Sequence, residues 1–296
     1  MKYEHRVVAF IDILGFRSHI DETTDKAGRD NEEKIQHMVS AYEAIKKVWE
    51  EDNSIAETKV SSSKRVSMFS DSIVVSFKAE EPNEVYYTLL NLKHLIMTLI
   101  YSRLLCRGAV SIGKFLHTDD YLFGPALVEA YTLESKAAMY PRIILDRDVI
   151  EASLDGKSVD HKNTDEIEYV ESLLEQDSDG MYYIDYFYKA RSELSGSEYD
   201  FPEYIDILGE LIRKGLMGSS HHGKADLRVK YSWMRERYNR MIDTVQSREA
   251  LKGWSGPGND EIANFYLSLK KISPRKDNKR LHSDRFSTAA RYQTGT

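Results

Sequence analysis

The segment VVAFIDILGF, residues 7–16, decides how the first half of the chain folds. Its apolar side chains are typical of a buried strand, and Gly15 provides a turn at its end. One carboxylate, Asp12, interrupts the apolar run. An ionised carboxylate removed from water is costly unless it is paired or bound to a metal ion. The segment therefore predicts a buried strand whose carboxylate needs a partner elsewhere in the chain.

A second carboxylate, Asp71, is the partner we expect. The segment RVSMFSDSIVVSF, residues 65–77, predicts two short strands with Asp71 near the turn that joins them. If the second of these strands lies beside the first strand of the chain, Asp12 and Asp71 meet. Two carboxylates at strand ends, beside backbone amides, are suited to a divalent metal ion that holds a triphosphate.

The order of elements predicts the fold class. Helical spacing of apolar residues indicates helices at 31–50, from 80–83 to about 105 and at 125–138, and strands are expected at 106–115 and 141–145. With the first strand and the hairpin, this order favours an α+β fold. We expect a ferredoxin-like sandwich with an antiparallel-rich sheet and helices on one face.

Changes in residue composition along the sequence divide the chain into three parts. Residues 1–155 form the predicted α/β unit, and 156–255 a mixed extension of strands and helices packed on it. Residues 256–296 are expected to be a linker and a mobile tail. The helix predicted at 226–246 is rich in arginine and aromatic residues, which can indicate nucleic-acid binding. Arginines on a solvated helix face explain this composition better, because the whole chain is acidic.

Composition excludes several classes of protein. Hydrophobic residues at 41% and charged residues at 30% are ordinary for a globular protein, and the net charge of -7 gives no attraction to nucleic acid. The single Cys106 excludes an internal disulfide and fits a reducing compartment. We expect no signal peptide and no membrane span, and hence a cytoplasmic location.

Four motifs in this order resemble the class III nucleotidyl cyclases, the homology domain of adenylyl and guanylyl cyclases. They are AFIDILGF at 9–16, FSDS at 69–72, RGAVSIG at 107–113 and GPALVEAYTLES at 124–135. The resemblance covers residues 5–150, about half of the chain. It implies the class III cyclase form of the ferredoxin-like sandwich.

Several residues depart from the family pattern, and these departures narrow the resemblance to one group of cyclases. Val128 stands where the family has an Asn that positions the ribose, and Thr132 where it has an Arg that steadies the transition state. Ser67 and Tyr121 stand at the two positions that read a purine. In these features and in its long C-terminal part, the chain is similar to the bacterial pyrimidine cyclases of anti-phage signalling. These make cyclic UMP or cyclic CMP, and we expect UTP as the preferred substrate and CTP next.

The resemblance also implies site residues. Asp12 and Asp71, with the Ile13 carbonyl, would hold two Mn²⁺ or Mg²⁺ ions, and Arg107 and Lys136 are candidates to replace the missing Arg. The other residues expected to contact the substrate are Ile13, Leu14, Gly15, Phe16, Arg17, Ser67, Tyr121 and Thr132. Family sites form between head-to-tail protomers, which implies a homodimer with composite sites. A downstream effector would respond to the cyclic product rather than by direct contact with the enzyme.

Three alternatives stay open. In the first, the chain is a catalytically degenerate cyclase-like module that binds a nucleotide or only dimerises. In the second, it is a purine nucleotide cyclase. A polymerase-palm enzyme that links two nucleotides also uses paired strand carboxylates. Among single residues, Arg107 equally fits a salt-bridge partner, and Lys136 a solvated lysine on a helix face.

Overall fold

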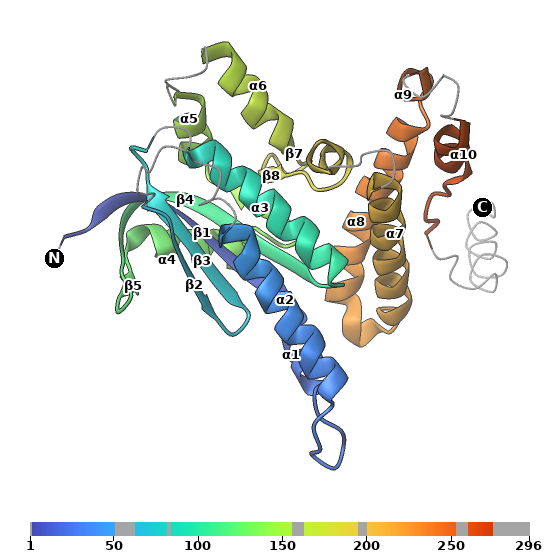
Figure 1. The fold of residues 1–296 in the computed structure, drawn as a ribbon, viewed down its shortest axis with the longest axis horizontal. Coiled ribbons are helices and arrows are strands. Elements are labelled where there is room, and N and C mark those ends of the chain that lie inside the picture. Colours follow the sequence, from blue (N-terminus) through green and yellow to red (C-terminus); the bar gives the residue numbers. More distant parts are fainter. Residues whose placement is uncertain are drawn as a thin grey trace, which may run out of the picture.

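The computed structural model describes residues 2–50, 63–81, 84–155, 163–194, 200–252 and 260–274. Helices and strands alternate through most of this length (Figure 1). In chain order the elements are β1 (Glu4–Leu14), α1 (Phe16–Asp21), α2 (Glu32–Glu50), β2 (Arg65–Phe69), β3 (Ser72–Lys78), α3 (Glu84–Tyr101), β4 (Leu105–His117), β5 (Leu122–Phe123), α4 (Pro125–Lys136), β6 (Ile143–Leu145), α5 (Arg147–Asp155), α6 (Asn163–Leu173), β7 (Leu174–Gln176), β8 (Tyr182–Ile184), η2 (Tyr188–Glu193), α7 (Asp200–Gly218), η3 (His222–Lys224), α8 (Ala225–Val245), α9 (Arg248–Lys252) and α10 (Asp260–Ser268).

One sheet organises the fold. Its strands follow the order β2-β3-β1-β4-β6-β8-β7, and the short β5 pairs with β4. All of these neighbours are antiparallel except β4 and β6, which are parallel. The class of the fold, α+β with an antiparallel-rich sheet, is therefore confirmed. The expected pairing of the first strand with the second hairpin strand is also confirmed, because β1 pairs with β3 along its length.

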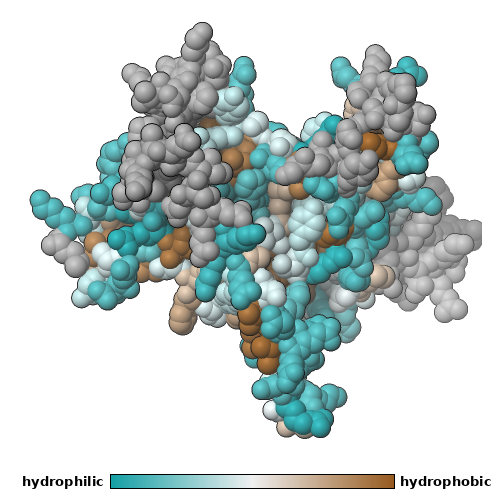
Figure 2. All heavy atoms as spheres, viewed as in Figure 1, coloured by the Kyte–Doolittle hydropathy of each residue, from teal (hydrophilic) through white to brown (hydrophobic). Residues whose placement is uncertain are grey.

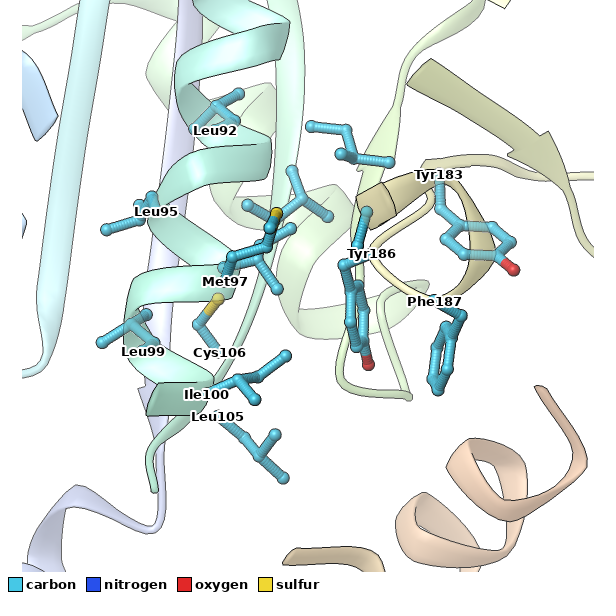
Figure 3. Packing of buried hydrophobic residues seen from close by; sticks show 14 of the residues in the cluster. Leu92, Leu95, Met97, Leu99, Ile100, Leu105, Cys106, Tyr183, Tyr186 and Phe187 are labelled. Carbon is cyan, nitrogen blue, oxygen red and sulfur yellow. The ribbon is translucent and has the colours of Figure 1, made fainter. Parts of the chain in front are cut away.

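The larger core lies on the sheet face that α2 and α3 cover. Alternation along β1 points Val7, Ala9, Ile11 and Ile13 to this face, where all four are buried. Helix α3 packs its apolar side across the same strands, and Figure 3 shows Leu92, Leu95 and Leu99 along this helix. Burial of this size holds β1, and therefore Asp12 at its end, in a fixed place.

The opposite face of the sheet carries α4. A smaller cluster forms there from Val8, Val74, Phe115 and Ala126, the last of which lies on α4. Ser111 donates a hydrogen bond of 2.7 Å to the Ala126 carbonyl and ties this helix to β4. The prediction that the helices share one face is therefore wrong for α4. Its alanines and the small residues of β4 allow the close approach that this packing needs.

The C-terminal part joins the same sheet rather than standing apart. Strands β7 and β8 extend it beyond β6, and α7 and α8 pack together at its far side (Figure 1). The acid-rich stretch before β8 forms α6 and β7, which the sequence does not reveal. Of the stretch expected to be linker and tail, 260–274 is described, and it packs through the buried side chains of Tyr266 and Ile272.

Helix α8 corrects one prediction. Its arginines are not all in water, because Arg237 is buried and pairs with the buried carboxylate of Asp177. Trp233, one turn earlier, is also buried, and it stacks on Tyr140 with ring centroids 5.4 Å apart. These contacts fix α8 against the segment that follows α4.

The visible surface is largely polar. Figure 2 shows mostly hydrophilic residues with small scattered apolar groups on the face that Figure 1 presents. Among the residues that the structure describes, no helix is long and apolar enough to span a lipid bilayer.

Candidate functional site

Asp12 lies near the end of β1, on the face of the sheet that carries α4. It is paired across the sheet with Ser72 of β3 on one side and Arg107 of β4 on the other. Its side chain is 22% exposed, so the carboxylate is withdrawn from bulk water but reachable. The apolar strand that the sequence predicts is what holds this carboxylate in place.

Asp71 is brought beside Asp12 by the turn between β2 and β3. The Ile13 amide donates a hydrogen bond of 2.8 Å to the Asp71 carbonyl, which joins the turn to the end of β1. The Tyr42 hydroxyl of α2 donates to the carbonyl of Ser70, whose φ of 54° marks the tight turn. Burial raises the pKa of Asp12, and the neighbouring Asp71 charge also raises it, against the opposing effect of Arg107. The two carboxylates therefore lie within electrostatic reach of each other.

Arg107 bridges Asp12 to a carboxylate that sequence reasoning missed. Its Nε lies 2.5 Å from Glu134 Oε1 and 3.4 Å from Asp12 Oδ2. Glu134 is buried on α4, and its Oε1 lacks an aligned hydrogen-bond donor among the described residues, so the contact is an ion pair. Burial raises the pKa of Glu134, Arg107 opposes the shift, and the Asp12 and Asp71 charges add to it.

Lys230 of α8 is a second cation near these carboxylates. Its positive charge lowers the pKa of both Asp12 and Glu134 and thus acts against the effect of burial. Lys230 precedes Trp233 by three residues and so lies on the same side of the helix, next to the stack on Tyr140. The sequence places Lys230 in a basic helix but gives no sign that its charge acts on Asp12 and Glu134.

The Gly15 turn follows Asp12 as expected. Gly15 has φ +73°, a conformation that favours glycine, and α1 begins directly after it. The amides of Ser18 and His19 donate to the Gly15 carbonyl. Those of Phe16 and Arg17 belong to the first turn of a helix, where amides lack an acceptor within the helix. These two amides could therefore hold an anion near Asp12.

The other predicted substrate contacts are spread over the α4 face. Ser67 shares this face with Asp12, and its Oγ lies 2.9 Å from Nε2 of His117. Tyr121 is 48% exposed before β5, and the Thr132 hydroxyl donates 2.7 Å to the Val128 carbonyl within α4. Lys136 is exposed at the end of α4. Among the described residues, no hydrogen bond or ion pair joins Tyr121, Thr132 or Lys136 to Asp12.

The donor set at this end of the sheet suits a hard divalent cation. Asp12 and Asp71 supply carboxylate oxygens, the preferred ligands of Mg²⁺ and Mn²⁺, and the 3.4 Å contact to Arg107 leaves Asp12 free to bind more closely elsewhere. Within the described residues no group of three or more His, Cys, Asp or Glu side chains is placed to hold a metal ion. A metal here would therefore depend on backbone and substrate oxygens besides the two carboxylates.

Comparison with known proteins adds no identification. No family model matches the chain, and no curated protein matches it.

Proposed function

We propose that the protein is a metal-dependent nucleotide cyclase that converts a pyrimidine ribonucleoside triphosphate to its 3′,5′-cyclic monophosphate and pyrophosphate. UTP is the favoured substrate and CTP the next. One observation carries the proposal: the bond from the Ile13 amide to the Asp71 carbonyl holds Asp71 beside Asp12 at one end of the sheet. Because both carboxylates are partly withdrawn from water, their proximity is costly unless cations compensate it.

The chain's own groups account for substrate binding. Asp12 and Asp71, with the carbonyl of Ile13, would hold the Mn²⁺ or Mg²⁺ ions. When bound, such ions lower the pKa of an attacking hydroxyl and neutralise phosphate charge. The amides of Phe16 and Arg17 would receive phosphate oxygens, because a helix N-terminus favours an anion.

The reaction is an in-line displacement. The ribose 3′-oxygen forms a bond to the α-phosphorus, the bond from that phosphorus to the bridging oxygen breaks, and pyrophosphate leaves. The hydroxyl proton is released to water. Negative charge grows on the transferring phosphoryl group, and stabilisation of this charge by a cation accelerates phosphoryl transfer. In the same chain, Arg107 lies 3.4 Å from Asp12, and the charge of Lys230 acts on the Asp12 carboxylate.

Exposed apolar side chains support a homodimer with composite sites. Phe69 is 83% exposed at the β2–β3 turn, and Val128 and Tyr131 are 64% and 53% exposed on α4. Tyr131 also packs edge-on against Phe10 of β1, so these side chains border the open part of the face that carries Asp12. A second copy would cover them and bring the exposed Lys136 of one chain toward the carboxylates of the other.

The proposed setting is cytoplasmic defence signalling. The cyclic pyrimidine nucleotide would act as a second messenger in anti-phage defence and would reach a separate effector by diffusion. This part of the proposal rests on the resemblance to bacterial pyrimidine cyclases.

Incubation of the purified protein with Mn²⁺ and each of the four ribonucleoside triphosphates tests the proposal. Mass spectrometry should detect cyclic UMP, with less cyclic CMP, and 3′-deoxy-UTP should give no pyrophosphate because it lacks the attacking hydroxyl. Cyclic AMP or cyclic GMP as the main product would indicate a purine cyclase. A linked dinucleotide would indicate a polymerase-palm enzyme, and the absence of any product would favour the degenerate module.

A further inference from the structure

A cavity of about 510 Å³ opens in the C-terminal part of the chain, outside residues 5–150 that carry the cyclase resemblance. One of its walls is the end of α6, and the other is η2. The described residues that line it are Ser172, Tyr188, Lys189, Arg191, Ser192 and Leu194. A volume of this size is typical of small-molecule sites.

The lining of this cavity is positively charged. Among the described residues it contains two cations, Lys189 and Arg191, and no acidic residue. Both cations are half-buried, and charges that are partly withdrawn from water are screened less by salt than exposed ones. In a chain with a net charge of -7, this local pair of cations favours an anionic ligand.

Glu193, the acid nearest to these cations in the sequence, is engaged elsewhere. Its Oε1 lies 2.8 Å from Nζ of the buried Lys93, and its Oε2 lies 3.6 Å from Nε2 of His94. Burial raises the pKa of Glu193, but hydrogen bonds with His94, Lys93 and a serine outweigh this effect and lower the pKa to about 2. The charge of Glu193 is therefore compensated by α3 rather than by the cations of the cavity.

Buried contacts hold η2 in place and so preserve the shape of the cavity. Tyr186 and Phe187, directly before η2, are buried in the core (Figure 3). The carboxylate of the buried Asp185 accepts hydrogen bonds of 2.9 Å from the Phe187 amide and 3.1 Å from the Lys189 amide. A wall fixed in this way needs little reordering when a ligand binds.

Two polar groups of the cavity keep hydrogen-bonding capacity for a ligand. Within the described residues, the Lys189 ammonium donates to the carbonyls of Glu171 and Leu174 at the end of α6. An ammonium has three hydrogens, so one remains for a ligand. The Ser172 hydroxyl donates 2.6 Å to the Tyr169 carbonyl, and its oxygen can therefore accept from a ligand hydroxyl.

We propose that this cavity binds a phosphorylated sugar, with its phosphate against Lys189 and Arg191 and a sugar hydroxyl that donates to Ser172. The ring of Tyr188, which is 36% exposed, and the Leu194 side chain offer apolar surface to the carbon side of the sugar. Inorganic phosphate alone would meet the cations but leave the rest of the cavity unfilled. The site uses none of the residues of the proposed cyclase site.

The test is calorimetric titration of the full-length protein with ribose 5-phosphate, in EDTA so that Asp12 and Asp71 hold no metal ion and repel phosphate. We expect saturable binding, and Arg191→Gln should weaken it about tenfold or more because a hydrogen bond between charged groups is lost. Arg147→Gln, a matched change at an 87% exposed arginine of α5, should leave the affinity unchanged. Ser172→Leu replaces an exposed hydroxyl by a side chain that fills the cavity, and it should abolish binding.

Each outcome decides the proposal. No saturable binding by the wild type, or equal affinity in the wild type and Ser172→Leu, overturns it. Inorganic phosphate that binds as tightly as ribose 5-phosphate indicates a simple anion site and also overturns it. If circular dichroism shows that Arg191→Gln is unfolded, Ser172→Leu decides alone.

Titration with UMP identifies the source of the sugar phosphate. Tighter binding of UMP than of ribose 5-phosphate, lost in Ser172→Leu, supports a nucleotide, and the reverse order supports a free sugar phosphate. None of these measurements depends on turnover. Failure of the cyclase proposal therefore leaves this site standing, and the absence of this site leaves the cyclase proposal standing.

Discussion

Arg107 Nε lies 2.5 Å from Oε1 of the buried Glu134, and this ion pair joins β4 to α4 at the candidate site. The same Nε donates a long hydrogen bond of 3.4 Å to Asp12 Oδ2. Glu134 and Asp12 thus share Arg107, and the long contact leaves Asp12 oxygen atoms available for a metal ion. Helix α4 therefore contributes to the site through the ion pair of Glu134 with Arg107, which is a role other than contact with the substrate.

Replacement of Glu134 tests the role of its ion pair with Arg107. We expect Glu134→Ala to lower the free energy of unfolding by about 2–4 kcal/mol, because removal of one partner from a buried pair leaves the other charge uncompensated. This range extends below the about 3–5 kcal/mol for breaking a fully buried pair, because the Arg107 side chain is 25% exposed. Chemical denaturation measures the change, and Ser135→Ala on the same helix is the matched control. A variant as stable as the wild type would contradict the role of the pair.

Lys230 provides the second prediction. Lys230→Ala should lower kcat about 10- to 100-fold, because it removes a positive charge beside Asp12 where negative charge develops. Lys224→Ala, at an exposed position just before the same helix, is the control. Steady-state kinetics with UTP separate kcat from KM. Equal rates for the two variants would exclude Lys230 and leave Arg107 and Lys136 as the cations.

The third prediction concerns pH. Burial is the largest cause that raises the pKa of Asp12 above 3.8 and of Glu134 above 4.5. The folded state therefore holds these protons to higher pH than the unfolded chain, so their contribution to stability is fully present below the ordinary pKa values and is lost as pH rises through the folded ones. Denaturation of the wild type and Glu134→Gln from pH 4 to 7 should show a shallower decline in the variant. An identical slope would contradict the raised pKa of Glu134.

The fourth prediction tests the composite site. Asp12→Ala and Lys136→Ala should each lose activity as homodimers, because one lacks a metal ligand and the other a cation offered to the second copy. Unfolding and refolding the two together should recover about a quarter of wild-type activity, because half of the dimers then hold one intact site. Recovery that never exceeds the sum of the separate activities would contradict the shared site.

The sequence predicts the parts of this fold whose causes are local. The strand with Asp12 follows from apolar periodicity broken by one costly charge, and the place of Asp71 follows once its strand pairs with the first. Glu134 stands in the segment GPALVEAYTLES, residues 124–135, but nothing in the helical pattern indicates that its carboxylate turns inward to Arg107. Lys230 and His117 lie beyond such reasoning because their neighbours come from separate elements. For His117 they are Ser67 on β2 and Ser76 on β3. The face on which α4 packs is also decided by tertiary contacts.

The central claim is that the Asp12 and Asp71 carboxylates hold the metal ions. Mn²⁺-dependent turnover of UTP in the wild type, Asp12→Ala and Asp71→Ala tests it most directly. The account predicts cyclic UMP from the wild type and a loss of about 100-fold or more in each variant, since each removes a ligand of the catalytic ions. Thermal unfolding and the dimer should be unchanged, because both side chains are partly exposed. Near-normal rates in either variant at saturating Mn²⁺ would contradict the account.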